Sequence, residues 1–167
     1  TALKDDVESK PFQRKFWQPP SDKEGTFQVR ILPPLKPLGE KLFYFKHLTH
    51  WVNGKSFECL SQTLADKSGA LHEGENCPVC EFTSHLYKTS ERDSEDWTLA
   101  GSLAKKTRYI YRVVVRNAED ETIPVFYESG KKIFDTLYHI ITETEYGIIV
   151  DPKNGRDFNI KKVGTGR

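Results

Sequence analysis

Residues 50–80 read HWVNGKSFECLSQTLADKSGALHEGENCPVC, and this stretch contains all three cysteines of the chain. Cys77 and Cys80 are separated only by Pro-Val, which is the spacing of a zinc knuckle: a turn of the chain brings two thiolates to one tetrahedral ion. Upstream, Asn53-Gly54 lies between two strand-like runs and predicts a two-residue hairpin turn. The stretch therefore predicts a small metal-binding subdomain at about residues 47–92.

The predicted hairpin supplies the other ligands of this subdomain. Its turn brings His50 and Cys59 close together near the open end of the hairpin. Together with Cys77 and Cys80 they form a set of one histidine and three cysteines, which closes a tetrahedral site and leaves no position for a catalytic water. We therefore expect one Zn²⁺ ion with a structural role.

Other interpretations of these residues are weaker. A disulfide fits poorly, because an odd cysteine count without a visible signal peptide indicates a reducing interior. A thioredoxin-like redox pair would need a βαβ context, which the elements around Cys77 do not provide. His47 competes with His50 as the ligand; the two lie on opposite faces of one strand, and the hairpin register favours His50. His72 is a weaker alternative ligand. We expect the remaining two histidines on amphipathic helices, namely His85 and His139.

Length and composition set broad limits on the class of protein. With 167 residues the chain is long enough to bury a core as one domain, and no segment reaches the apolar length of a membrane span. The formal net charge of +1 does not decide whether nucleic acid is a partner, because the clustering of basic residues matters more. Here several aromatic residues lie beside lysine and arginine instead of within apolar runs.

The hydrophobic pattern predicts many short strands with helices between them. We expect a flexible arm at residues 1–25, and an acidic polar loop at 91–96 after the first helix. Strands are predicted at residues 26–32, 41–52, 55–60, 107–116, 122–128, 146–150 and 157–163, and helices at 77–90, capped by Asn76, and at 130–142. The predicted fold class is mainly β (α+β): an OB-fold-like antiparallel barrel over residues 26–167, with the zinc-binding subdomain inserted in one loop.

The segment 105–112 reads KKTRYIYR and alternates cations with aromatic residues. On an extended strand Arg108 and Arg112 lie on one face, and Tyr109 and Tyr111 on the other. Such a strand can contact phosphates and offer rings to unstacked bases. A core strand with half-buried tyrosines and solvated arginines is the alternative interpretation.

A second basic segment begins the predicted helix at residues 130–142. Gly130 is followed by Lys131 and Lys132, so amide groups and two ammonium groups meet at the start of a helix. This arrangement suits a phosphate group.

The order of these motifs resembles a known family. The ordered set is TFQVRILP, a histidine hairpin with NGK, a lone cysteine, CPVC, KKTRYIYRVVV, GKKIFD and RDFNIKKV. It is similar to the core of the zinc-containing, helix-destabilising single-stranded DNA-binding protein of T-even-type tailed bacteriophages, over residues 26–163. In that family an OB-fold binds single-stranded DNA beside a zinc subdomain, whose ligands correspond here to His50, Cys59, Cys77 and Cys80.

The resemblance implies a function and a DNA-binding site. It implies a non-enzymatic protein that binds single-stranded DNA without sequence preference, in phage DNA replication, recombination and repair, in the cytoplasm of the infected bacterial host. It would act as a monomer or by cooperative self-association on DNA. The cleft residues of the family correspond here to Tyr87, Trp97, Lys105, Lys106, Arg108, Tyr109, Lys131 and Lys132, to which the basic strand adds Tyr111 and Arg112.

The chain also departs from the family pattern. The loop between Cys59 and Cys77 is longer than in the family, and Ile110 stands where an aromatic residue would follow Tyr109. Phage replication proteins would be recruited through an acidic C-terminal tail that these residues do not include. The alternative function is a zinc-stabilised protein-interaction module in a replication or transcription assembly. A zinc hydrolase would need an open coordination position and a general base.

Overall fold

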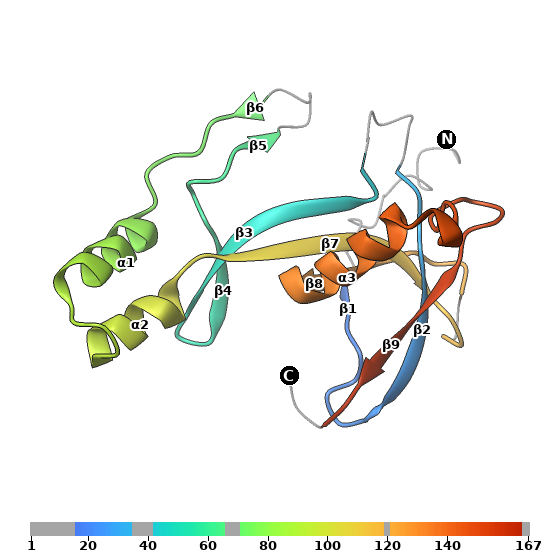
Figure 1. Cartoon of the computed structure of the whole chain (residues 1–167), viewed down its shortest axis with the longest axis horizontal. Coiled ribbons are helices and arrows are strands. Elements are labelled where there is room, and N and C mark those ends of the chain that lie inside the picture. Colours follow the sequence, from blue (N-terminus) through green and yellow to red (C-terminus); the bar gives the residue numbers. More distant parts are fainter. Residues whose placement is uncertain (1–15, 35–41, 66–70, 119–120, 165–167) are drawn as a thin grey trace, which may run out of the picture. The chain divides into compact units, whose positions relative to one another are not determined.

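The computed structural model describes residues 16–34, 42–65, 71–118 and 121–164 (Figure 1). Most of the predicted arm, residues 1–15, lies outside this description. The chain divides into two compact units. The first, here called the sheet unit, comprises Thr1–Tyr44, Ile110–Glu128 and Thr136–Arg167; the second, here called the metal unit, comprises Phe45–Tyr109 and Ser129–Asp135.

The sheet unit is built on five strands in the order β1-β8-β7-β2-β9. Their bounds are β1 (Phe16–Trp17), β8 (Val125–Gly130), β7 (Lys106–Val115), β2 (Gly25–Ile31) and β9 (Asp157–Lys162). Strand β2 pairs antiparallel with both neighbours, so that Val29 lies opposite Val115 on one side and opposite Phe158 on the other. In the described residues this sheet is open. The α+β class is confirmed, whereas the predicted closure into a barrel is not seen.

Alternation along the strands places the core of the sheet unit on one face of the sheet. Val29 and Ile31 of β2 are buried, as a period of two requires for the run TFQVRIL. Tyr111 of β7 is fully buried, and its ring stacks against Phe43 and Tyr127 at centroid distances of 6.3 and 6.1 Å. Aromatic and β-branched side chains thus form this core.

An ion-pair network lies on the opposite face of the same sheet. Asp157 accepts hydrogen bonds from Arg30 at 3.1 Å and from Arg116 at 3.0 Å. The guanidinium of Arg30 also donates to the carbonyl of Gly155. Because the Asp157 carboxylate lies beside Arg116, the pKa of that guanidinium is raised above its ordinary value. One carboxylate therefore connects strand β9 to β2 and to Arg116, the residue that follows β7.

Most of the predicted elements in the sheet unit are confirmed. Helix α3 (Lys131–Thr142) matches the predicted helix at 130–142. The strand predicted at 122–128 begins later, at Val125. The strand predicted at 146–150 is wrong, because the chain forms the 3₁₀ helix η3 (Thr144–Tyr146), followed by Gly147 with a φ of 67°. A left-handed residue at that position interrupts an extended strand.

The metal unit begins with the predicted hairpin. Strands β3 (Tyr44–Val52) and β4 (Lys55–Glu58) pair antiparallel. The turn residues Asn53 and Gly54 have φ values of 48° and 75°, as a type I′ turn requires. The predicted two-residue turn is therefore confirmed. A further short pair, β5 (Leu64–Ala65) with β6 (Leu71–His72), follows the hairpin.

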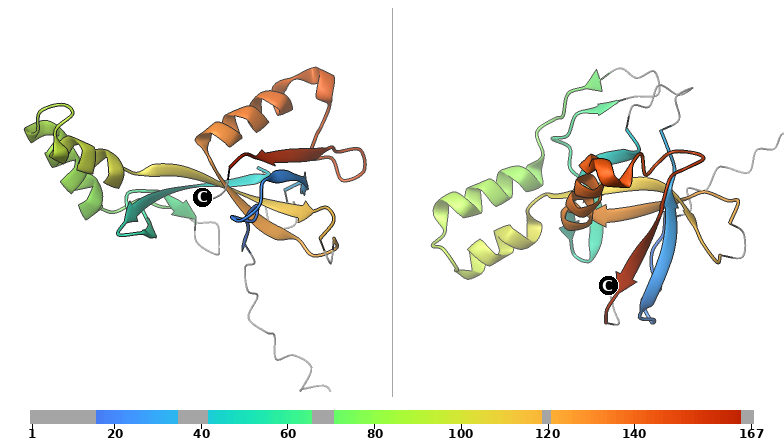
Figure 2. Two further views of the ribbon diagram at one scale, coloured as in Figure 1. Left: turned by 90° about the horizontal axis from the view of Figure 1, so that it is seen from below. Right: turned by 45° about the vertical axis from the view of Figure 1, so that its right-hand side comes forward.

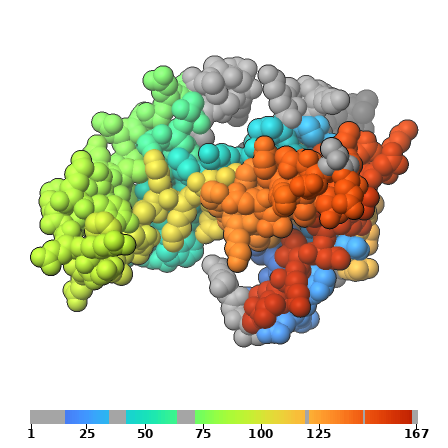
Figure 3. Space-filling view, in the orientation of Figure 1, coloured from blue at the N-terminus to red at the C-terminus, as the bar shows by residue number. Residues whose placement is uncertain are grey.

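Two helices complete the metal unit. Helix α1 (Pro78–Thr89) confirms the helix predicted after the knuckle. Figures 1 and 2 show α1 and α2 (Glu95–Leu103) side by side, and their surfaces, yellow-green in Figure 3, meet without a break. None of the helices in the described residues is long and apolar enough to cross a membrane.

The structure differs from the sequence prediction at both of these helices. Asn76 is not the cap of α1: Cys77 is the N-cap residue and no side chain caps this helix, whose first position is Pro78. Helix α2 was not predicted, because its first residues were interpreted as part of an acidic loop. The signal was present, since Ser94 caps α2 by accepting a hydrogen bond from the amide of Trp97 at 3.2 Å.

Candidate metal centre

Four side chains of the metal unit converge in a single cluster. Nε2 of His50 lies 3.4 Å from Sγ of Cys77 and 3.5 Å from Sγ of Cys80. Sγ of Cys59 lies 3.5 Å from Sγ of Cys80, and all the ligand atoms are within 4.8 Å of one another. Around a tetrahedral zinc ion, with bonds of about 2.3 Å to sulfur and about 2.0 Å to nitrogen, neighbouring ligand atoms would be separated by roughly 3.5 to 3.8 Å. The cluster therefore fits one such ion.

This cluster contains the four predicted ligands. The alternatives His47 and His72 are not members of it. His85 and His139 lie exposed on α1 and α3, as predicted.

The β3–β4 hairpin positions His50 and Cys59. In its register His50 lies opposite Phe57 and Thr49 opposite Glu58. The amide of Cys59 then donates to the carbonyl of Leu48 at 2.8 Å, so that pairing continues one residue beyond the strand. The type I′ turn fixes this register, because a two-residue loop leaves no slack.

The loop after Cys59 is held against the segment that leads to the knuckle. The buried side chain of Gln62 accepts a hydrogen bond from the amide of Leu48 at 2.7 Å, and the amide of Glu75 donates to the carbonyl of Leu60 at 2.8 Å. At Gly74 a Cβ atom would lie 2.3 Å from the carbonyl carbon of Ser61. Only glycine allows the two backbones to approach this closely.

The knuckle cysteines occupy the beginning of helix α1. Cys77 is the N-cap residue, and its carbonyl accepts from the amide of Glu81 at 3.0 Å. Cys80 lies in the first turn, where its carbonyl accepts from the hydroxyl of Thr83 at 3.0 Å. The amide groups and the dipole at this end of a helix stabilise negatively charged thiolates.

The protonation of the cluster follows from its contacts. Burial raises the pKa of the Cys59 thiol, but hydrogen bonds from the hydroxyl and the backbone of Ser61 outweigh burial and lower this pKa to about 6. Burial and the neighbouring Cys59 raise the pKa of Cys80 to about 11. Burial lowers the pKa of His50, yet its hydrogen bond with Leu103 and the nearby Cys59 raise it overall. The Cys59 thiol therefore loses its proton more readily than the Cys80 thiol.

The donor set determines which chemistry this centre supports. Three thiols and one imidazole suit Zn²⁺, whose binding would remove the thiol protons and fix the relative positions of the hairpin and the knuckle. Because all four positions would be filled by protein atoms, the centre would act as a structural crosslink.

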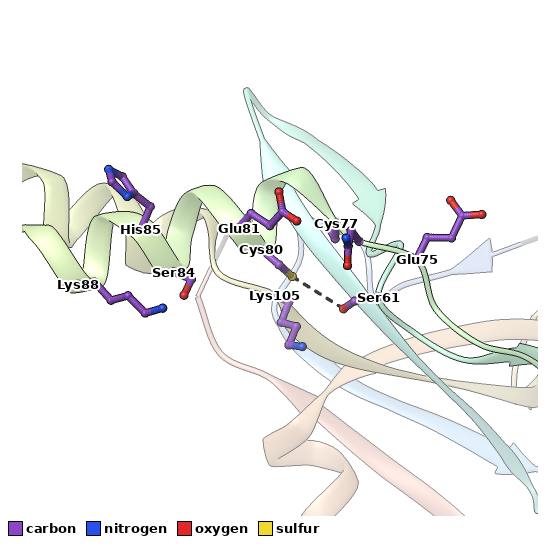
Figure 4. Close-up of a pocket in the computed structure, with 10 residues that line it drawn as sticks. Ser61, Glu75, Cys77, Cys80, Glu81, Ser84, His85, Lys88 and Lys105 are labelled. Carbon is purple, nitrogen blue, oxygen red and sulfur yellow. Dashed lines mark hydrogen bonds between the residues drawn. The ribbon is translucent and has the colours of Figure 1, made fainter.

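A groove of about 480 Å³ adjoins the cluster on the side of Cys80, which is the only partly exposed cysteine of the three. Figure 4 shows Lys105 beside Cys80 and Ser61, whose Sγ and Oγ are 3.9 Å apart. The groove is lined by Ser61, Glu75, Asn76, Cys77, Cys80, Glu81, Ser84, His85, Lys88 and Lys105. The edge of the metal centre is thus next to a residue of the predicted DNA-binding set.

The predicted DNA-binding cations of the metal unit lie on two segments that approach each other at Arg108 and Gly130. Lys105 and Lys106 are exposed at the start of β7. A Cβ atom at Gly130 would lie 3.4 Å from a guanidinium nitrogen of Arg108, so the start of β7 lies beside the start of α3. The first two residues of α3 are exposed lysines. We call the resulting set the basic cluster: Lys105, Lys106, Arg108, Lys131 and Lys132.

The predicted stacking residues are less accessible. Tyr109 is only 6% exposed, and Tyr111 of the sheet unit is fully buried, so neither ring faces solvent in this conformation. The structure favours the core interpretation for both. Tyr87 and Trp97 are half-buried between α1 and α2, with their ring centroids 4.7 Å apart and their planes at 74°. Arg112, in the sheet unit, donates to the carbonyl of Pro33 at 2.9 Å.

Comparison with protein-family models and with curated proteins finds no match for this chain. The family resemblance drawn from the sequence motifs therefore stays a hypothesis.

Proposed function

We propose that this chain is a zinc-stabilised protein that binds single-stranded DNA without sequence preference. The observation that carries the proposal is the basic cluster. It comprises five cationic side chains on two segments (residues 105–108 and 131–132), which lie more than twenty residues apart in the sequence and approach each other at Arg108 and Gly130.

The charge of this cluster favours a polyanionic ligand. Lys131 forms an exposed ion pair with Asp135 at 2.6 Å, which offsets one of the five charges. Exposed ion pairs contribute little free energy, so a phosphate can replace such a carboxylate at low cost. Cations that neutralise phosphates release condensed counterions, and this gives affinity without sequence preference.

The aromatic pair of the metal unit supports single strands over duplex. Tyr87 and Trp97 keep part of their rings at the surface, and base stacking on such rings needs unstacked bases. Preference for the unpaired strand would pull the melting equilibrium of a duplex towards single strands by mass action. The OB-fold architecture and a role in phage DNA replication, recombination and repair are part of the proposal and rest on the motif resemblance.

The proposal is tested by titrating a labelled oligothymidine and a matched duplex at roughly 50 and 200 mM salt, where phosphate contacts are strongly weakened by the higher concentration. We expect tighter binding to the oligothymidine, with affinity falling as salt rises. Fluorescence of Trp97, measured against a Trp97→Phe variant, should be quenched on binding. Absence of oligothymidine binding at the lower salt concentration, or equal affinity for the duplex, would contradict the proposal.

One observation favours the alternative of a protein-interaction module. On the β3–β4 hairpin, Trp51 and Phe57 are 42% and 52% exposed. Exposed aromatic side chains are enriched at protein interfaces. A chain that fails to bind oligothymidine but loses partner binding on substitution of Trp51 and Phe57 would belong to this class.

A further inference from the structure

The imidazole of His50 contacts two different structures through its two nitrogens. Nε2 is directed at the thiols of Cys77 and Cys80, at 3.4 and 3.5 Å. Nδ1 lies 2.8 Å from the carbonyl oxygen of Leu103. His50 is only 1% exposed, so water does not compete for either contact.

The contact with Leu103 determines the tautomer of the ring. A carbonyl oxygen only accepts hydrogen bonds, so Nδ1 must carry the proton. The lone pair of Nε2 is then free to face the thiols of the cluster. A metal-ligating histidine usually donates its second nitrogen in this way, which fixes the orientation of the ring.

The same contact caps the end of helix α2. Leu103 is the last residue of that helix, and its carbonyl has no partner inside the helix. The amide of Ala104 still donates to the carbonyl of Ala100 at 2.9 Å, but Ala104 itself leaves the helix with a ψ of 143°. The Nδ1 proton of His50 therefore satisfies the Leu103 carbonyl at the point where the chain turns from helix to strand.

The basic segment begins immediately after this point. Only Ala104 separates Leu103 from Lys105, and strand β7 starts at Lys106. Lys105 also extends into the groove lined by Cys77 and Cys80 (Figure 4). The backbone before the two lysines thus contacts His50, and the side chain of Lys105 lines the groove beside the metal centre.

We infer that His50 is a positioning residue for the basic cluster. By binding the Leu103 carbonyl, it fixes the junction between α2 and β7 and so places Lys105 and Lys106 for contact with phosphates. This inference rests on the proposed function for its DNA-binding part. The position of the junction itself does not depend on that function.

The test separates the hydrogen bond from the metal. The variant His50→Cys offers four thiolates, a set that binds zinc, but lacks the Nδ1 donor. The control variant Cys80→His offers two imidazoles and two thiolates, and keeps the contact between His50 and Leu103. Cobalt absorption spectra, taken with Co²⁺ alone as the probe, establish that each variant forms a tetrahedral centre.

Two readouts are then compared in the zinc-loaded proteins. In His50→Cys we expect amide hydrogen exchange at Lys105 and Lys106 to become about tenfold faster, since losing a buried hydrogen bond favours local opening to about that extent. We expect oligothymidine affinity to fall by a similar factor. Cys80→His keeps the contact between His50 and Leu103, so amide exchange at Lys105 and Lys106 should stay at the wild-type rate in this variant.

Several outcomes would overturn the inference. One is unchanged exchange in a metal-loaded His50→Cys variant, and another is an equal effect in Cys80→His. If His50→Cys does not bind the metal, long-range proton–nitrogen NMR spectra of the wild-type protein decide instead. A proton on Nε2 of His50 would refute the inference, and a proton on Nδ1 supports it. If the wild type binds no oligothymidine, the proposed function fails, while the exchange data still test the junction.

Discussion

The ring of Tyr109 lies face to face with the ring of Phe134, with centroids 3.8 Å apart and planes inclined by 2°. Tyr109 belongs to β7 and Phe134 to the first turn of α3, so this pair holds the two basic segments together. The sequence motifs left two roles open for Tyr109, a surface ring that stacks on bases and a half-buried ring of a core strand. The structure indicates an internal contact that assembles the basic cluster.

Replacing Tyr109 should therefore affect stability first. We expect Tyr109→Ala to lower the free energy of unfolding by about 3 to 5 kcal/mol, as for other buried aromatic residues. Tyr109→Phe keeps the ring and should lower the free energy of unfolding much less than Tyr109→Ala. Urea unfolding measures both. Full stability of Tyr109→Ala together with weakened oligothymidine binding would instead assign the ring to base stacking.

The lysines of the basic cluster should account for the salt dependence of binding. In Lys105→Ala/Lys106→Ala we expect weaker binding to all sequences, with a slope of log affinity against log salt reduced by about 0.7 for each lost contact. The variant Lys23→Ala/Lys153→Ala removes two exposed charges from the sheet unit and serves as the control. Salt titrations with a labelled oligothymidine provide the slopes. Equal slopes in the two variants would exclude this role.

Metal content should depend on the knuckle. We expect the wild-type chain to bind one zinc ion and Cys77→Ser/Cys80→Ser to bind none stoichiometrically, because two of the four ligands are lost. Removal of zinc from the wild type by a chelator should unfold the hairpin and the knuckle, whose own apolar core is small. Elemental analysis and circular dichroism measure the two effects. Stoichiometric zinc in the double variant would refute the proposed site.

Metal affinity should rise with pH. In the metal-free chain the Cys80 thiol, with a pKa of about 11, is still protonated at neutral pH, so metal binding must displace its proton. Each displaced proton makes the apparent affinity about tenfold stronger per pH unit. As the pH falls, the His50 imidazole, whose pKa is raised above its ordinary value, becomes protonated as well, and below about pH 6 so does the Cys59 thiol, so the dependence should steepen. Cobalt titrations across this range would show a flat profile if no proton were displaced.

Substitution by alanine should have different effects at two glycines of the metal unit: it should lower the metal affinity at Gly74 and raise the stability at Gly101. Gly74→Ala places a Cβ atom 2.3 Å from the backbone of Ser61, so we expect the loop near the ligands to shift and the metal affinity to fall. Gly101 lies in α2, where a Cβ atom meets only the hydroxyl of Tyr87 at 3.5 Å. Gly101→Ala should raise stability by about 0.5 to 1 kcal/mol, because alanine favours helix. Thermal unfolding and metal titration of both variants give the comparison.

The sequence was sufficient for features that depend on local backbone geometry. The Asn53-Gly54 turn fixes the register of its hairpin, and this register predicts His50 over His47 as a ligand. The knuckle spacing places Cys77 and Cys80 on one turn of chain. Alternation along β2 and β7 also predicted these two strands, because side chains in a strand alternate with a period of two.

Other features depended on contacts between distant segments. Helix α2 was missed because its short, acidic first turn is also typical of a loop, and packing against α1 decides the outcome. The burial of Tyr109 and the hydrogen bond from His50 to Leu103 each join residues at least 25 positions apart. No local pattern encodes such pairs, because their free energy arises only when tertiary packing excludes water from both partners. The sequence thus determined which four residues form the candidate metal centre. The tertiary structure decided which groups these residues and strand β7 contact.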